Sequence, residues 1–438
     1  MIPKNCKQKT VNYLAFHLMT HVSNLTTNIS ADVCILGAGP AGVVASMFLA
    51  KNGIKPLLID KGKFPRDKVC GDAISGKAVD VLKKLDERIV NRLHLEPTQV
   101  GSWGVAFIAP NLKRIRIPFG NSKNGTSVPP GYISRRVDFD DFLVRFAKEN
   151  YGIDRVEEVA LNDFQFQNSD WLCKSSDGKI SVKAKLLVVA DGAQSAFARK
   201  IGGINVEREH YCAGIRAYYS GVKNLDAGNF IELYFLKELL PGYFWIFPLP
   251  DGKANAGLGM RSDKVSSKKV NLKEMLPEII NRYPELRKRF ENATLEGSVK
   301  GFGLPLGSLK RKISGTGYML CGDAASLIDP FTGEGIGNAM LSGMMAGQQA
   351  MKCLQANNFS AEFISEYDAR VYGRLWRELS LSRRLQQLAA VPWLFNLVVG
   401  KAAASKSLQE VISCMFTDLD MRKKLKQLSF YFDLLLAK

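Results

Sequence analysis

The chain has 438 residues, of which 46% are hydrophobic and 23% are charged. This composition excludes a disordered or collagen-like chain, and the length predicts about two or three domains with a sizeable core. Lys and Arg number 60 against 42 Asp and Glu, a net charge of +18. Such an excess predicts attraction to an anion and leaves nucleic acid, a phosphorylated ligand and an acidic membrane surface open.

The cysteines argue against a disulfide framework and against a zinc site. The eight are spread along the chain without a Cys-x-x-Cys pair or histidines at metal-site spacing. We therefore expect no metal and a reducing, cytoplasmic location. Residues 1–30 are expected to form an N-terminal extension, because His17 interrupts their only apolar stretch and no cleavage pattern follows. The apolar segment 388–399 is shorter than the roughly 18 residues of a spanning helix.

The first chemical motif is a glycine turn between a strand and a helix. Residues 31–36 form a mostly apolar run that stops at Gly-x-Gly-x-x-Gly, residues 37–42, and residues 43–52 have helical character. Residues 55–60 predict a second strand, which ends in Asp60. This order of strand, glycine turn, helix, strand and acid is typical of a dinucleotide-binding βαβ unit.

Each residue of this unit has a physical role. Gly37 permits the tight turn, Gly39 lets the backbone approach a pyrophosphate, and Gly42 allows close packing of helix on strand. The N-terminus of the helix offers free N–H groups and a positive dipole end to phosphates. Asp60 can accept hydrogen bonds from the hydroxyls of an adenosine ribose.

The next segments, in chain order, alternate between loops, helices and short strands. We expect a loop at 62–75, a helix at 77–85, strands at 104–109 and 113–117, a loop at 121–131, a helix at 139–151 and a strand meander at 155–190. The last strand of the meander is apolar and stops at Asp191 and Gly192, as a strand that enters a ligand crevice would.

The second half of the chain changes character twice. Residues 203–306 alternate and are rich in aromatic residues, which predicts an antiparallel sheet with a helical insertion at 272–290. Residues 318–323 return to the short buried-strand type, and everything from Gly335 onward has helical character. We therefore predict an α/β protein whose nucleotide-binding domain is discontinuous, with the domains 1–30 (extension), 31–202 with 307–350 (nucleotide-binding), 203–306 (antiparallel sheet) and 351–438 (helical).

Three fingerprints stand in one order: residues 37–42, Ala190-Asp191-Gly192 and Cys321-Gly322-Asp323. Together they resemble the flavin-dependent oxidoreductases of the para-hydroxybenzoate hydroxylase type, over residues 31–350. The resemblance implies a Rossmann-type FAD-binding domain in which Asp323 bonds the ribityl chain of FAD. The turn Arg136-Val-Asp-Phe-Asp140 is similar to the family's arginine-x-x-apolar-acid turn, whose arginine lies along the cofactor.

A glycine-rich loop, residues 333–337, precedes the last helical region. Its N–H groups and the helix dipole could stabilise the negative charge that a reduced flavin gathers on its pyrimidine side. Motifs and resemblance together predict that FAD contacts Gly37, Gly39, Pro40, Ala41, Gly42, Asp60, Lys61, Arg136, Asp191, Gly192, Gly322, Asp323, Gly333, Gly335, Ile336 and Gly337.

Two further segments are similar to motifs of the geranylgeranyl reductase group, which saturates isoprenoid C=C bonds with reduced FAD. They are residues 64–72 (FPRDKVCGD) and 243–248 (YFWIFP). The resemblance implies that Cys70 lies beside the flavin and that the second segment lines the substrate channel. Period-two geometry independently puts alternate side chains of that strand on one face, so the expected prenyl-binding residues are Tyr243, Trp245, Phe247 and Pro248.

One departure from the group affects the channel entrance. The group usually places a proline three residues before the tyrosine, whereas Pro241 precedes Tyr243 by two. The chain length that the channel accepts is therefore left open, as is the identity of the isoprenoid.

The expected reaction is hydride transfer from reduced FAD to one alkene carbon, with protonation of the other in a dry apolar pocket. Cys70 is the candidate catalytic residue, which either donates the proton or only packs there. The alternative function on this fold is a flavin monooxygenase or halogenase. Halogenases carry Trp-x-Trp-x-Ile-Pro, where this chain has Tyr243, Trp245, Phe247 and Pro248.

Partners are only partly indicated. Basic residues are dispersed and no nucleic-acid-reading module is found, so we expect no nucleic acid. Arg383, Arg384 and the cluster 422–426 flank apolar segments that could rest on an anionic membrane or pack as a helical subdomain. Only one dinucleotide-type unit is found, which leaves NAD(P)H and a ferredoxin-like donor open as the reductant. The oligomeric state is not indicated.

Overall fold

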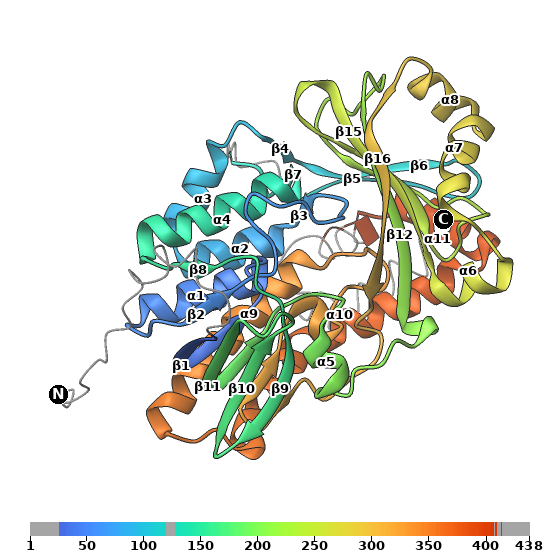
Figure 1. Ribbon diagram of the computed structural model, residues 1–438. Coiled ribbons are helices and arrows are strands. Elements are labelled where there is room, and N and C mark those ends of the chain that lie inside the picture. The colour runs from blue at the N-terminus through green and yellow to red at the C-terminus, as the bar shows by residue number, and fades with distance from the viewer. Residues whose placement is uncertain (1–25, 120–127, 407, 410–412, 414–438) are drawn as a thin grey trace.

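The computed structural model describes residues 26–119, 128–406, 408, 409 and 413. Four expectations therefore fall wholly or partly outside the described residues: most of the N-terminal extension, part of the loop 121–131, the end of the helical region 351–438 and the basic cluster 422–426. The described chain folds into two large sheets joined by helices (Figure 1).

The first sheet has eight strands and is mainly parallel. Its path runs β17-β18-β11-β1-β2-β8, and β10 and β9 extend it from β11 in antiparallel fashion. The strands are β1 (Thr27–Leu36), β2 (Leu57–Ile59), β8 (Arg155–Val156), β9 (Leu161–Gln167), β10 (Asp170–Ser175), β11 (Ile180–Val189), β17 (Ser314–Gly315) and β18 (Tyr318–Leu320).

Register brings the ends of the parallel strands together. Leu36 pairs with Val189 and with Ile59, and Val189 pairs with Leu320. The glycine turn, Asp60 and the other two fingerprints each follow one of these strand ends, so all of them meet at one edge of the sheet. Ligands of open parallel sheets bind at this edge.

Helices pack against this sheet and against one another. They are α1 (Pro40–Lys51), α2 (Gly76–Leu85), α3 (Glu87–His94), α4 (Arg136–Tyr151), α5 (Ala196–Lys200) and α9 (Ile336–Ala356). Helix α1 is central, because nine of its twelve residues are buried. Helix α9 packs against it without space for a side chain at Gly343, where a Cβ would lie 2.2 Å from the carbonyl oxygen of Ala41.

The second sheet has seven strands in the order β16-β12-β15-β14-β13-β5-β6. They are β5 (Gly104–Ile108), β6 (Arg114–Pro118), β12 (Tyr211–Ser220), β13 (Ile231–Tyr234), β14 (Tyr243–Pro248), β15 (Lys253–Arg261) and β16 (Thr294–Pro305). Helices α6 (Ser262–Lys268), α7 (Leu272–Arg282) and α8 (Pro284–Phe290) lie along this sheet (Figure 1). The predicted helical insertion is present, with a break at Tyr283.

The placement of residues 104–118 corrects the sequence analysis, which assigned them to the nucleotide-binding domain. Strand β5 pairs in parallel with β13, from Ile231 opposite Val105 to Tyr234 opposite Ile108, and so belongs to the second sheet. Its residues are buried on both faces, with Phe107 in one apolar cluster and Ile108 in another. A parallel pairing over more than a hundred residues has no local sequence signal.

A small third sheet and the C-terminal helices complete the fold. The sheet consists of β3 (Ala73–Ile74), β7 (Gly131–Ser134) and β4 (Gln99–Ser102), and single-turn helices occur at η3 (Arg208–His210), η4 (Pro250–Gly252) and η5 (Gly322–Ala325). Helix α10 (Ala361–Ala389) contacts β17 and β18, and α11 (Pro392–Ala404) contacts β6, so this pair links the two large sheets (Figure 1).

In the described part of the chain, no single helix is long and apolar enough to cross a membrane. Helices α10 and α11 meet the length and composition criteria only together, with a bend of 118° between them.

Candidate active site

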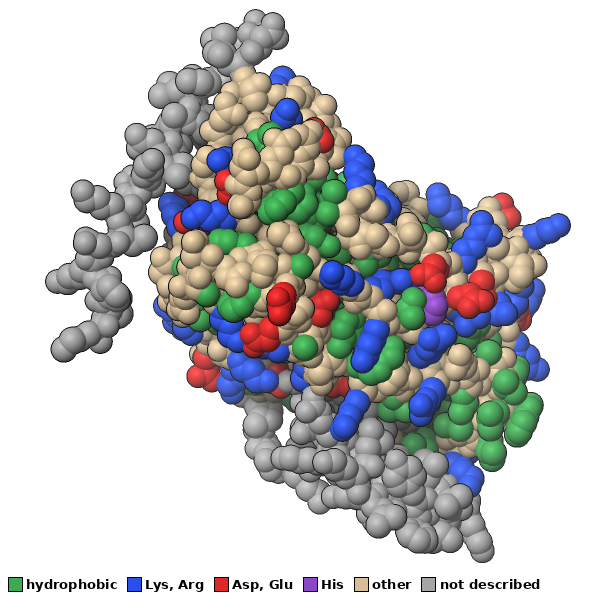
Figure 2. Space-filling model, turned by 90° about the horizontal axis from the view of Figure 1, so that it is seen from below, with side chains coloured by type: hydrophobic (Ala, Val, Ile, Leu, Met, Phe, Trp, Pro, Cys, Tyr) green, Lys and Arg blue, Asp and Glu red, His purple; other side chains and the backbone are tan. Residues whose placement is uncertain are grey.

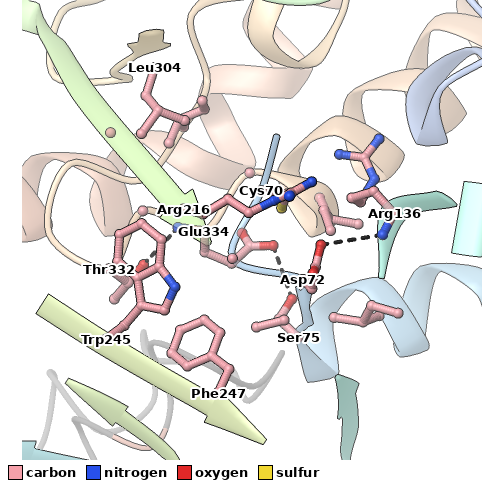
Figure 3. Close-up of a pocket in the computed structure, with 18 of the residues that line it drawn as sticks. Cys70, Asp72, Ser75, Arg136, Arg216, Trp245, Phe247, Leu304, Thr332 and Glu334 are labelled. Carbon is pink, nitrogen blue, oxygen red and sulfur yellow. Dashed lines mark hydrogen bonds between the residues drawn. The ribbon is translucent and has the colours of Figure 1, made fainter. Parts of the chain in front are cut away.

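A cavity of about 170 Å³ lies between the strand ends of the first sheet and the face of the second. It brings together residues that the sequence singled out from distant segments. Those that line it are Pro40, Cys70, Arg136, Tyr243, Trp245, Phe247, Asp323, Gly333, Gly335 and Ile336. Figure 3 shows the Cys70 loop on one side of the cavity and Trp245 and Phe247 on the other.

The glycine turn has the geometry that a pyrophosphate needs. Gly37 has a φ of +98°, and a Cβ on Gly42 would lie 1.9 Å from the Gly37 carbonyl oxygen. At Gly39, in contrast, the nearest atom to a Cβ would be Arg66 Nη2 at 3.8 Å, so the turn is open on that side. Helix α1 starts with no side-chain cap and no acid in its first turn, so its N-terminus fits an anion.

Asp60 lies where the βαβ unit predicts it, and it is 5% exposed. Its carboxylate accepts hydrogen bonds from the backbone N–H of Ala38 at 2.7 Å and of Gly62 at 2.8 Å. Arg66 also binds it, at 3.0 and 3.1 Å, and reaches Asp140 at 3.2 Å. No sequence motif pointed to Arg66 as a site residue. Lys61 is exposed at the same edge.

The other two fingerprints contribute acids at the neighbouring strand ends. Burial raises the pKa of Asp191 to about 6, although the hydrogen bond from Ser195 lowers it. The Oδ1 atom of Asp191 is buried and has no hydrogen-bond partner among the described residues. Gly192 follows with a φ of +83°. Asp323 receives Lys68 Nζ at 2.9 Å, a contact that the sequence analysis also missed. A buried carboxylate oxygen without a donor fits the hydroxyl or N–H groups of a bound cofactor.

Arg136 begins helix α4 and is 3% exposed. Its guanidinium binds Asp140, the acid of its own turn, through Nε and Nη2 at 2.7 Å each. Despite burial, this carboxylate raises the pKa of Arg136, so the side chain stays charged beside the cavity. This pair explains the spacing of the arginine-x-x-apolar-acid turn, because residues four apart share one face of a helix.

The loop before helix α9 forms another wall. Gly333 has a φ of +72°, and the hydroxyl of Tyr243 donates to the carbonyl of the preceding residue, Thr332, at 2.6 Å. Glu334 accepts from the N–H of Gly337 at 2.6 Å and from Ser75 Oγ at 3.0 Å. The N–H of Gly337 therefore already has a partner within the protein, and Gly337 does not line the cavity.

The aromatic strand β14 shows the alternation that its sequence predicts. Tyr243, Trp245 and Phe247 belong to the apolar cluster on the cavity side, whereas Phe244 and Ile246 belong to the cluster on the opposite side. The apolar end of the cavity is completed by Phe119, Ile231 and Leu233. Pro248 ends the strand and is buried, but it does not line the cavity.

Cys70 lies on the loop between β2 and β3 and lines the cavity. Burial raises the pKa of its thiol, although Arg136 and Lys68 oppose this effect. The group is therefore a thiol at neutral pH and is able to donate a proton. At the next residue, Gly71, a Cβ would lie 2.9 Å from the Phe247 ring, so this loop packs directly on the aromatic wall.

Three successive charged residues anchor the Cys70 loop. Arg66 binds Asp60 and Asp140, and Lys68 binds Asp323, all on the side of the first sheet. Between them, Asp67 accepts from Arg216 of β12 at 2.7 Å and from Lys300 of β16 at 2.9 Å. The loop is thus held by ion pairs to both large sheets.

Buried polar residues of the second sheet were missed from sequence. Arg216, Tyr218 and Asn255 lie in β12 and β15 and bind residues of the Cys70 loop. Of the three, Asn255 had a signal in the sequence, because it is a polar residue in the otherwise small and apolar run of residues 254–260.

Comparison with known proteins agrees with this site. Residues 30–368 match the model of the FAD binding domain family. A digeranylgeranylglycerophospholipid reductase of Methanococcus aeolicus is 32% identical over 368 residues, which cover 82% of this chain and 87% of that protein. A menaquinone reductase of Mycobacterium tuberculosis is 30% identical over 386 residues, which cover 84% and 86% of the two chains.

Solved structures share the fold. A geranylgeranyl bacteriochlorophyll reductase-like protein of Thermoplasma acidophilum superimposes with a TM-score of 0.76 at 24% identity, covering 91% of this chain and 99% of that one. A flavin-dependent brominase reaches a TM-score of 0.71 at 21% identity, covering 93% and 98%. The fingerprints at one sheet edge, the family match and these relatives show that the chain belongs to the geranylgeranyl reductase family of FAD-dependent oxidoreductases.

Proposed function

We propose that this protein saturates C=C bonds of a prenyl chain with reduced FAD. One observation carries the proposal: a single cavity has the fingerprint loops on one wall and the aromatic face of β14 on another. Relatives named as reductases of digeranylgeranylglycerophospholipid and of menaquinone support it, since both compounds carry prenyl chains.

FAD, when bound and reduced, supplies the hydride. The glycine turn and Asp60 would hold its adenosine diphosphate half, while Asp323, Arg136 and the loop 333–336 would hold the ribityl chain and the ring. Tyr243, Trp245 and Phe247 would exclude water and orient an apolar chain, because Trp245 and Phe247 are buried and Tyr243 is partly buried in the second sheet.

The proton for the second carbon is assigned to Cys70. Its thiol is protonated at neutral pH for the reason given above and lines the cavity. A packing role without proton donation is the alternative. It predicts that C70S, which nearly keeps the size of the side chain, retains turnover while C70A slows it.

Anaerobic turnover tests the function. Reduced enzyme is mixed without oxygen with geranylgeranyl diphosphate, a digeranylgeranyl lipid or a menaquinone, and products are measured by mass. Addition of hydrogen pairs with flavin oxidation is expected. Flavin that stays reduced with every compound and reoxidises only when oxygen is admitted would instead favour a monooxygenase or halogenase, which shares this fold.

The electron donor is tested in the same apparatus. NAD(P)H and a ferredoxin-like protein are both proposed reductants, and each is mixed anaerobically with oxidised enzyme. The donor that bleaches the flavin absorbance within the turnover time is the physiological class.

We also propose that the protein works in the cytoplasm and docks on an anionic membrane through helix α11. The inner face of α11 buries Phe395 and Val399, while Trp393 and Leu397 on the outer face are 69% and 49% exposed. Leu112 is also 49% exposed, on a loop bonded to α11 through Asn111 and Asn396 at 3.1 Å.

Charge complements this apolar surface. Lys113 is exposed beside Leu112, and its Nζ would lie 4.0 Å from a Cβ at Gly400 of α11. Each basic residue near an anionic surface adds about 1 kcal/mol to binding. In the view from below, exposed hydrophobic side chains gather toward one edge, with Lys and Arg side chains around them (Figure 2).

Sedimentation with vesicles tests this surface. The protein should pellet with phosphatidylglycerol vesicles more than with phosphatidylcholine vesicles, and the double variant W393A/L397A should remain in the supernatant. The matched control is V206A/L295A, two exposed apolar residues elsewhere, which should pellet as the wild type does. Equal pelleting of both double variants would refute this surface.

A further inference from the structure

Asp72 is a fully buried carboxylate at the meeting point of three elements. Its Oδ1 accepts from the backbone N–H of Arg136, which begins α4, at 3.2 Å. Its Oδ2 accepts from the hydroxyl of Tyr218 in β12 at 2.7 Å and from Nδ2 of Asn255 in β15 at 2.8 Å. One carboxylate therefore connects the cofactor side of the cavity with the second sheet.

Asn255 extends this connection to the substrate wall. Its Nδ2 also donates to the carbonyl of Cys70 at 2.9 Å, and its Oδ1 accepts from the indole N–H of Trp245 at 2.9 Å. An ionised carboxylate accepts hydrogen bonds only, so it fixes which end of the amide faces it. The oxygen end is then directed at Trp245, and the orientation of the indole depends on Asp72.

The charges around Asp72 are mostly positive. The positive groups are Arg135 and Arg136 at the start of α4 and Arg216 of β12. The neutral titratable groups that face Asp72 are Tyr218 of β12 and Cys70 of its own loop. Burial raises the pKa of Asp72 to about 6. The hydrogen bonds from Tyr218 and Asn255 and the positive charges of Arg216 and Arg136 oppose this rise. Below that pH the carboxyl group is neutral and accepts the hydrogen bonds from Tyr218 and Asn255 more weakly, because bonds to an ionised acceptor are the stronger ones.

We propose that Asp72 is a positioning residue, whose ionised form holds Trp245 and the Cys70 backbone, through Asn255, in the geometry that receives a prenyl chain. The role of the wall in binding a prenyl chain rests on the function proposed above, but the coupling between Asp72 and Trp245 does not. Figure 3 shows the two residues on opposite sides of the cavity.

Fluorine NMR of the FAD-loaded protein tests the coupling without any substrate. The protein is labelled with 5-fluorotryptophan, and the resonance of Trp245 is assigned by its loss in W245F. We expect this resonance to shift between pH 5 and 8 with a midpoint near 6 in the wild type, and to lose that titration in D72N. The hydrogen bond from Tyr218 favours the ionised form, so Y218F should move the midpoint to higher pH.

The control is D368N, which alters another acid whose pKa burial raises and which belongs to helix α10. It should leave the Trp245 titration unchanged. A Trp245 resonance that does not titrate in the wild type, or that titrates identically in D72N and Y218F, would overturn the proposal. Y218F alone decides the matter if D72N does not fold or does not retain FAD.

Kinetics then connect the coupling to the reaction. With a prenyl substrate, kcat/KM of the wild type should fall below pH 6 through a rise in KM, and D72N should lose this acidic limb. A titration seen by NMR together with no prenyl reduction would reject the proposed function and keep the positioning role. Prenyl reduction without a titration of the Trp245 resonance would keep the proposed function and reject the positioning role of Asp72.

Discussion

Replacing Tyr243 by Phe should weaken both the fold and FAD binding. The hydroxyl donates to the carbonyl of Thr332 at 2.6 Å, and Thr332 is 8% exposed and immediately precedes the glycine loop that lines the cavity. The substitution keeps the ring in its cluster and removes only this bond.

The expected loss in the free energy of unfolding depends on the carbonyl of Thr332, which is left without a hydrogen-bond donor. A typical hydrogen bond contributes about 1 kcal/mol, and a buried carbonyl left without a donor costs about 1–3 kcal/mol. We therefore expect the free energy of unfolding to fall by about 1–3 kcal/mol. Because the loop also becomes less fixed, FAD should bind up to about tenfold more weakly, which corresponds to about 1.4 kcal/mol.

Urea unfolding and fluorescence titration with FAD measure the two effects. The matched control is Y219F: Tyr219 is a half-buried tyrosine of β12 that packs on Phe290, and its hydroxyl forms no hydrogen bond with the described residues. If Y243F and Y219F agree in both unfolding free energy and FAD affinity, the link between the aromatic strand and the glycine loop is refuted.

Substitutions at three further positions test the site. C70A and C70S should leave FAD bound and slow substrate-dependent flavin reoxidation, and unchanged turnover in stopped-flow measurements would remove Cys70 from the mechanism. G42A should abolish FAD binding, read from flavin absorbance after purification, because its Cβ would lie 1.9 Å from the Gly37 carbonyl oxygen. Burial raises the pKa of Asp191 to about 6, whereas the same carboxyl group in the unfolded chain titrates near pH 4. Between pH 4 and 6 the folded protein without cofactor therefore binds a proton that the unfolded chain has released. The free energy of unfolding falls as the pH rises through this range. D191N should therefore raise the melting temperature of the cofactor-free protein at pH 7.5 relative to wild type, with a smaller gain near pH 4; an equal gain at both pH values would contradict this reasoning.

Local chemistry made much of the fold predictable. The glycine turn needs a positive φ at Gly37 and close contact at Gly42, and only glycine meets both conditions, so these positions are visible in sequence. The aromatic strand was visible for a similar reason, since alternation in a strand is a property of neighbouring residues. The fingerprint residues at strand ends follow from the same local patterns.

Long-range pairing was not predictable in this way. Strand β5 lies in the second sheet because β13 pairs with it, and no property of residues 104–108 alone specifies that partner. The same holds for Arg66 and Lys68, because the carboxylates that they bind, Asp60 and Asp323, follow the ends of other strands. Asn255 gains its role only from three partners, which come from two segments distant from it or from each other in sequence: Cys70 and Asp72 of one loop, and Trp245 of β14.

The ion pairs of the Cys70 loop limit how this loop can be transferred from one relative to another. Its charged residues find their partners on two different sheets, so a loop grafted alone into another scaffold would bring charges whose counter-ions stayed behind. The smallest transferable unit contains the loop, the strands that carry Arg216 and Lys300, and the segments that carry Asp60, Asp140 and Asp323. A change of this loop between relatives therefore requires matched changes on both sheets.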